Sequence, residues 1–197
     1  MRIRSFVVAL MLGACSLVVP AQMAGGPQAA VGTRATPAQS LDVMLTLFEK
    51  EMVPAAKAMP ADKYDFAPSA ATFAANSSEK FDTVRTFGQQ VAHVAEANYY
   101  FYSTLSGLKP DMDMSKVDKM VKKDEAVMAL EMSLAFAHKA IATITAENAF
   151  ETIKGADGMN TRATLAAFGV AHGYDHYGQM VEYLRMNGIV PPASVPK

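Results

Sequence analysis

Residues 171–192 read AHGYDHYGQMVEYLRMNGIVPP, and this stretch determines both the expected fold and the expected site. A stripe of side chains leads into it and runs through it at the three- and four-residue spacing of one helix face: Leu165, Phe168, His172, His176, Gln179 and Tyr183. Asn187-Gly188 predicts the end of this helix, and Pro191-Pro192 prevents it from continuing. The stretch therefore predicts a long helix that carries two imidazoles where core side chains are expected.

Three further segments repeat apolar residues at helical spacing, and they predict helices over residues 37–58, 79–105 and 117–146. Thr36 is a suitable N-cap for the first of them, and Pro37 suits the first helical position. Pro54 is expected to bend or end that helix. We find no segment with the alternating period of a strand, so the pattern predicts an all-α protein.

The expected connections are rich in Pro, Gly, Asp, Ser and Asn, and they cover residues 59–79, the loop GLKPDMDMSK (107–116) and the turn GADGMN (155–160). Asn160 or Thr161 can cap the last helix, which should run to Met186. Four long amphipathic helices joined in this way predict a four-helix bundle over residues 37–192.

Residues 1–21 have the pattern of a signal peptide. Arg2 and Arg4 precede a long apolar run, and the small residues at positions 19–21 predict cleavage after Ala21. The apolar run is too short to be expected as a transmembrane span. We therefore expect an exported protein, periplasmic or secreted.

A second interpretation of the same segment is a lipoprotein signal, because Leu12-Gly13-Ala14-Cys15 resembles a lipobox with Cys15 as the acylated residue. The apolar residues 17–19 after this cysteine favour a continuing signal-peptide core over an exposed tether, so soluble export is preferred. Residues 22–36 are small, polar and Gly-rich, and they predict a flexible lead-in to the bundle.

Composition limits the chemistry. The 197 residues are 51% hydrophobic and 19% charged, which is typical of one globular domain with a real core. The formal net charge of −1 becomes −3 once Arg2 and Arg4 are removed, and no run of like charges indicates a nucleic-acid surface. Cys15 is the only cysteine, so catalysis in the mature protein must depend on His, Asp, Glu, Tyr or a metal.

The four-residue spacing of His172 and His176 places both imidazoles on one helix face, close enough to share a metal ion. A buried polar strip costs free energy unless each group has a partner, and a divalent cation would supply one. A third ligand should come from another helix. His93, on a polar and aromatic stripe, is slightly favoured over His138, whose neighbours are mostly apolar, and both remain open on spacing alone.

These pieces resemble the DinB-like (DinB/YfiT) superfamily. The matching segments are VAHVAEANYYF around His93, HGYDHYGQ (172–179) and the tail YLRMNGIVPP (183–192). The resemblance extends over about residues 37–192, and it implies a four-helix bundle with a long connection between its second and third helices. It also implies one divalent metal ion, nickel, zinc, iron or manganese, bound by three histidines.

Carried over to this chain, the ligands implied by the resemblance are His93, His172 and His176, and His138 is left out. The better-understood members of the family are thiol-dependent, so the resemblance implies a metal-dependent S-transferase or hydrolase for a small molecule, with a low-molecular-weight thiol as a further cofactor. The family often has H-E-x-x-H-R-G-Q, whereas Gly173 and Tyr177 stand at the glutamate and arginine positions here. The alternative is a non-catalytic metal-binding or stress-associated bundle, which could act as a homodimer.

Three neutral imidazoles leave positions on an ion open, which is the pattern of a catalytic metal site. Glu96, one turn after His93, is the candidate catalytic proton carrier, and Asp175 is a weaker one because it lies off the stripe. Three tyrosines could line the pocket: Tyr99, Tyr100 and Tyr174. Separately, the M-x-M spacing in residues 111–114 would suit copper(I), although two thioethers are few for a site.

Overall fold

The computed structural model of the protein describes residues 30–72 and 80–196. The predicted signal peptide, residues 1–21, lies outside the described residues, and so does most of the expected lead-in. Residues from Ala35 onward form one structural unit. Within the described ranges, no helix has both the length and the apolar character that crossing a membrane requires.

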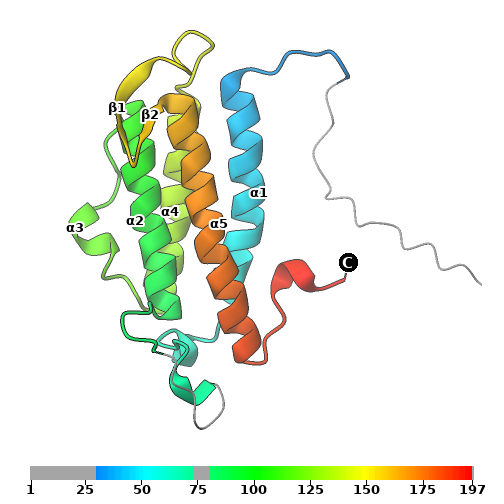
Figure 1. Cartoon of the computed structure of the whole chain (residues 1–197), viewed down its shortest axis with the longest axis vertical. Helices are drawn as coiled ribbons and strands as arrows, with labels where there is room; N and C mark the ends of the chain where they lie inside the picture. Colours follow the sequence, from blue (N-terminus) through cyan, green and yellow to red (C-terminus); the bar gives the residue numbers. More distant parts are fainter. Residues whose placement is uncertain (1–29, 73–79, 197) are drawn as a thin grey trace, which may run out of the picture. The chain divides into compact units, whose positions relative to one another are not determined.

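Four long helices lie side by side in this unit (Figure 1): α1 (Pro37–Ala58), α2 (Phe87–Ser106), α4 (Lys123–Ile141) and α5 (Arg162–Met186). Helix α2 packs against α4 and α5, and α1 packs against the same two helices. Each helix contributes fully buried side chains to one core, among them Phe48, Tyr102, Leu134 and Leu165. The prediction of a mostly helical protein is confirmed.

Helix α1 begins and ends where the sequence predicts. The Thr36 hydroxyl accepts a hydrogen bond from the Gln39 N–H (3.1 Å), and the Gln39 side chain accepts one from the Thr36 N–H (2.9 Å). This reciprocal pair is a capping box, and Pro37 occupies the first helical position. The expectation that Pro54 could end the helix is wrong, because the helix continues to Ala58.

Helix α2 begins later than the expected residue 79, because residues 80–86 are not helical. Thr86 is the N-cap, and it forms a second capping box with Gln89. The apolar spacing of Phe81 and Val84 extended the prediction too far towards the N-terminus. A local hydrogen-bonding signal, Thr-x-x-Gln, marks the true start better than periodicity does.

The expected helix over residues 117–146 is wrong at both ends. Residues 118–122 are not helical, and Val117 ends a separate turn of helix, α3 (Met114–Val117), which is capped by the Asp113 carboxylate accepting from the Ser115 N–H at 3.1 Å. Helix α4 then covers Lys123–Ile141 only. Residues 107–122 therefore form the connection between α2 and α4, which the resemblance places between the second and third long helices.

The expectation that no strand is present is also wrong. Strand β1 (Thr152–Ala156) pairs antiparallel with β2 (Met159–Thr161), and this hairpin contacts α2 and α5. Asp157 and Gly158 both have positive φ angles, 50° and 80°, as a two-residue type I′ hairpin turn requires. The pair Asp157-Gly158 was a signal for a hairpin, but only a turn was predicted there.

Helix α5 follows the hairpin directly, because Thr161 ends β2 and caps the helix by accepting from the Thr164 N–H at 3.2 Å. The helix ends at Met186 as predicted, and Gly188 adopts the left-handed conformation (φ 73°) that closes the C-terminus. The Ile189 N–H then donates to the Leu184 carbonyl at 2.9 Å.

Gly173, between the two histidines, is the point where α5 approaches α1. A Cβ atom at this position would lie 2.4 Å from Cζ of Phe48, a side chain with no exposed surface. Position 173 therefore has no room for the glutamate that the resemblance leads one to expect there. The departure from the family pattern follows from the packing of α5 on α1.

Replacing Gly173 with Ala should lower the free energy of unfolding by about 1–2 kcal/mol. Overpacking against Phe48 costs about 1–3 kcal/mol, and the better helix propensity of alanine offsets up to ~1 kcal/mol of that cost. Gly178→Ala is the matched control, because a Cβ on this exposed glycine of the same helix meets nothing within 4 Å. It should stabilise the protein by about 0.5–1 kcal/mol. Urea unfolding measures both, and a stabilising Gly173→Ala would contradict the packing argument.

Candidate metal site

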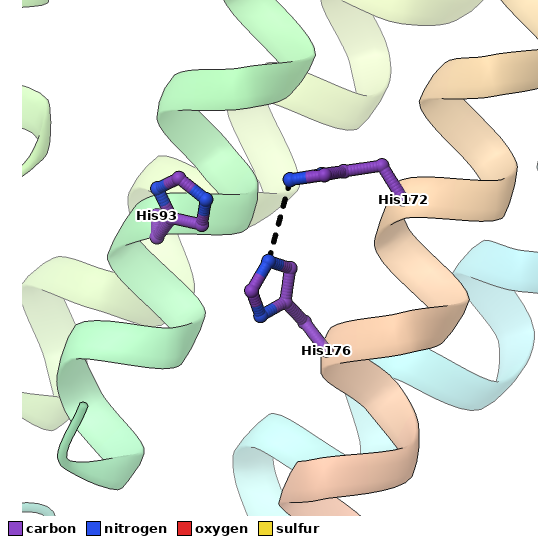
Figure 2. Close-up of side chains that lie close together, drawn as sticks. All are labelled: His93, His172 and His176. Carbon is purple, nitrogen blue, oxygen red and sulfur yellow. Dashed lines mark hydrogen bonds between the residues drawn. The ribbon is translucent and has the colours of Figure 1, made fainter. Parts of the chain in front are cut away.

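Three histidines meet between α2 and α5. His93 lies on α2, and His172 and His176 lie one turn apart on α5, with their rings turned towards one another (Figure 2). One ring nitrogen of each residue lies within 4.8 Å of the corresponding nitrogens of the other two. The three ring centroids are separated by 4.6–5.2 Å. These are the three histidines predicted as metal ligands.

The closest pair has the spacing that a shared ion needs. Nε2 of His172 lies 3.3 Å from Nε2 of His176. Two nitrogens bound at 2.0–2.1 Å to one tetrahedral ion are separated by about 3.3–3.4 Å. The donor set therefore fits a divalent metal ion, and His93 needs only a side-chain adjustment to complete it.

The surroundings keep all three imidazoles uncharged at neutral pH. Burial, together with the nearby Arg85 guanidinium and His172, lowers the pKa of His93 to about 4. Burial, together with the neighbouring histidines, likewise lowers the pKa of His176 to about 4. The pKa of His172 is also lowered by burial. Metal binding requires unprotonated imidazole nitrogens, so these shifts favour coordination.

The site is open on one side and closed on another. His176 is buried, with 5% of its surface exposed, whereas His93 borders a polar recess of about 550 Å³. The residues lining this recess are Thr83, Val84, Arg85, Gln89, His93, Glu96 and Asp118. On the closed side, the rings of Phe101 and Phe168 contact His172 at centroid distances of 5.5 and 6.2 Å. A small molecule would therefore approach from the recess.

A sequence profile of the DinB superfamily matches residues 44–180, which is more than two thirds of the chain and includes all three histidines. The protein belongs to the DinB superfamily. A search of curated proteins found no match to the chain. The resemblance seen in the sequence is thus confirmed at the level of the superfamily.

A chain of side-chain hydrogen bonds extends from the site of this DinB-superfamily protein. Nδ1 of His176 lies 2.6 Å from Oε1 of Gln90, and Nε2 of Gln90 donates to Oε1 of Gln179 at 2.7 Å. Nε2 of Gln179 donates in turn to the Asp175 carboxylate at 3.1 Å. Gln179 was predicted on the inner stripe of its helix, whereas Gln90 was not predicted as a site residue. Gln90 lies three residues before His93, hence on the same face of α2, and this spacing was the available signal for it.

Glu96 lies beside His93, and its catalytic role stays a prediction. Its Oε2 lies 3.7 Å from Nδ1 of His93, and its side chain lines the recess. Burial raises the pKa of Glu96, and the negative charge of Asp118 adds to the rise, while Arg85 opposes it. A carboxylate whose pKa is raised is a stronger base than an ordinary glutamate, which suits general acid–base chemistry.

The other predicted lining residues lie elsewhere. None of Tyr99, Tyr100 and Tyr174 lines the recess beside His93. The Tyr99 hydroxyl donates to the Asp111 carboxylate at 2.7 Å, and the Tyr174 ring packs edge-on against Phe48 of α1. Asp175 is exposed, and its contact is with Gln179.

His138 has a structural environment of its own. It lies on α4, and its two ring nitrogens contact Asp42 and Glu49 of α1 at 2.5 and 3.1 Å. Burial by itself lowers the pKa of His138, but the hydrogen bonds to the two carboxylates outweigh it and raise the pKa. His138 therefore ties α1 to α4, and it is not among the clustered histidines of the described residues.

The loop considered for copper(I) also has a structural role. The thioethers of Met112 and Met114 are half-buried and pack against the hydrophobic core. Asp113, between them, caps α3. These contacts account for the two methionines as core-filling side chains.

Proposed function

We propose that this protein binds one divalent metal ion through His93, His172 and His176 and uses it in a reaction on a small molecule, as a metal-dependent S-transferase or hydrolase. The observation that carries the proposal is the convergence of three neutral imidazoles from two helices beside an open recess. The packing of α1, α2, α4 and α5 supports the four-helix bundle that we propose as the scaffold of the site.

A divalent ion held by three imidazoles keeps at least one position free, where it would lower the pKa of a water or thiol. The residues of the recess would serve the reaction in different ways. Arg85 presents a guanidinium to an anionic group of a small molecule, and Glu96 can hold or release a proton close to His93. The rings of Phe101 and Phe168 pack against His172 and would hold its orientation.

The metal-binding proposal predicts a specific pattern of metal content. Replacing His93, His172 or His176 with Ala should reduce bound metal at least tenfold, because each variant removes one of three ligands. His138→Ala is the control and should retain its metal, since both ring nitrogens of this histidine are hydrogen-bonded to Asp42 and Glu49 of α1. Elemental analysis of protein purified without an affinity tag gives the answer. Equal metal retention in all four variants would exclude the three-histidine site.

The catalytic part of the proposal is tested with metal-loaded and chelated protein, using glutathione with an activated aryl halide and, separately, activated esters. We expect turnover only in the metal-loaded form, with Glu96→Gln slowing it about 100-fold or more while the metal content is unchanged. Glu147→Gln, an exposed carboxylate outside the recess, is the matched control. A metal-loaded protein that turns over none of these substrates would favour the non-catalytic metal-binding bundle.

We also propose that the protein is exported, on the evidence of the basic start, the apolar run and the small residues before position 22. Intact-mass measurement of protein recovered from the native compartment should show a chain that begins at Gln22. A chain that begins at Cys15 and carries acyl groups would instead establish the lipoprotein alternative. A chain that retains Arg2 and Arg4 would contradict both forms of export.

A further inference from the structure

We infer that Gln90 is a positioning residue: together with Gln179 and Asp175 it holds the proton of His176 on Nδ1, so that the lone pair of Nε2 faces the histidine cluster. The inference deepens the proposed function and rests on the proposed metal site. It concerns a property of the metal-free protein, however, and can be measured in the absence of any ion.

Asp175, at one end of this series of hydrogen bonds, determines the direction of every bond in the series. The Asp175 carboxylate can only accept, so the group of Gln179 that lies 3.1 Å from it must be the NH₂. The same NH₂ lies 3.5 Å from the Asp175 backbone carbonyl, which also only accepts. The other end of Gln179, which faces Gln90, must therefore be its carbonyl oxygen.

The orientation of the Gln179 amide determines that of Gln90 on α2. A Gln179 oxygen at 2.7 Å requires a donor, so Gln90 presents its NH₂ to Gln179 and its oxygen to His176. Nδ1 of His176, 2.6 Å from that oxygen, must then carry the ring proton. With the ring proton on Nδ1, the lone pair of the imidazole is on Nε2, and this is the atom that lies 3.3 Å from Nε2 of His172.

Burial disfavours any other arrangement of these donors and acceptors. Gln90 is only 2% exposed, and His176 is 5% exposed, so water cannot easily replace a lost partner. An unpartnered buried donor or acceptor costs about 1–3 kcal/mol, which penalises a flipped amide or the other tautomer of His176. The chain also bridges α2 and α5, the two helices that supply the ligands, and so it maintains their spacing.

The two histidines of α5 are held in different ways. Nε2 of His176 can only accept, so the 3.3 Å contact requires His172 to carry its proton on Nε2 in the metal-free protein. Among the described residues, no hydrogen bond to Nδ1 of His172 is found, and its ring is held by contacts with Phe101 and Phe168. His172 can therefore exchange its Nε2 proton with solvent and take one up on Nδ1 when an ion binds, whereas His176 keeps its tautomer.

The test is a long-range ¹H–¹⁵N correlation spectrum of histidine-labelled, metal-free protein at neutral pH, repeated with Zn²⁺. Before Zn²⁺ is added, we expect His176 as the single Nδ1–H tautomer and His172 as the Nε2–H tautomer. With Zn²⁺, His172 should change to Nδ1–H, and His176 should not change. An Nε2–H or mixed-tautomer His176 in the metal-free protein would overturn the inference.

Variants separate positioning from packing. Gln90→Leu should give His176 a mixture of tautomers and weaken Zn²⁺ binding about 10–100-fold. Asn98→Leu is the matched control, because Asn98 is an equally buried amide of α2 that donates to Ser133, away from the histidines. It should lower stability but leave the His176 tautomer and the Zn²⁺ affinity unchanged. Equal losses of affinity in the two variants would mean that Gln90 acts only through packing.

Gln90→Glu provides a conservative rescue and a second variant if Gln90→Leu does not fold. Its carboxylate still accepts from Nδ1 of His176, so the Nδ1–H tautomer should be retained, while the lost NH₂ donor to the Gln179 oxygen should lower stability. Loss of the tautomer in this variant would contradict the inference. If the wild-type protein does not bind Zn²⁺ or another divalent ion, the proposed function fails, while the metal-free spectrum still decides whether the hydrogen-bond chain sets the tautomer.

Discussion

The candidate site depends on a buried polar seam between α2 and α5, which consists of Gln90, His172, His176 and Gln179. Gln90 and His176 are almost fully removed from water, so each of their polar atoms needs a partner within the protein or from an ion. Hydrogen bonds through Gln179 satisfy one side of the seam, and the facing nitrogens of His172 and His176 form the other. The same desolvation keeps the imidazoles neutral, which links the energetics of burial to the capacity for binding a metal.

Helix α5 has different requirements on its two sides. Towards α2 it presents the histidines and Gln179, and towards α1 it presents Gly173, where the ring of Phe48 leaves no space for a side chain. This explains how the chain can belong to the DinB superfamily and still lack the frequent glutamate after the first histidine of the motif. The carboxylate beside the site is instead that of Glu96 on α2, at the recess that His93 borders.

The elements that could be predicted are those with strong local signals. The start of α1 and the C-terminal end of α5 were predicted correctly, because the Thr36 cap, Pro37 and Gly188 act through neighbouring backbone groups. The start of α2, the break between α3 and α4, and the β1–β2 hairpin were missed. In the first two cases apolar periodicity continued past the end of the helix, because Val84 and Val117 repeat at helical spacing without lying in the long helices. In the third, strands of five and three residues are too short to show a clear period of two.

The sequence by itself determined that His172 and His176 share one helix face, since a spacing of four residues allows no other outcome on an α-helix. It also placed His93 among the candidates, but it left His138 open, because helical periodicity specifies a face and not the neighbour that covers it. Only the tertiary structure decided between them: α2 packs its His93 face against α5, whereas α4 turns His138 towards the carboxylates of α1. The role of Gln90 likewise could not be predicted from the sequence, because its hydrogen bonds join residues more than eighty positions apart.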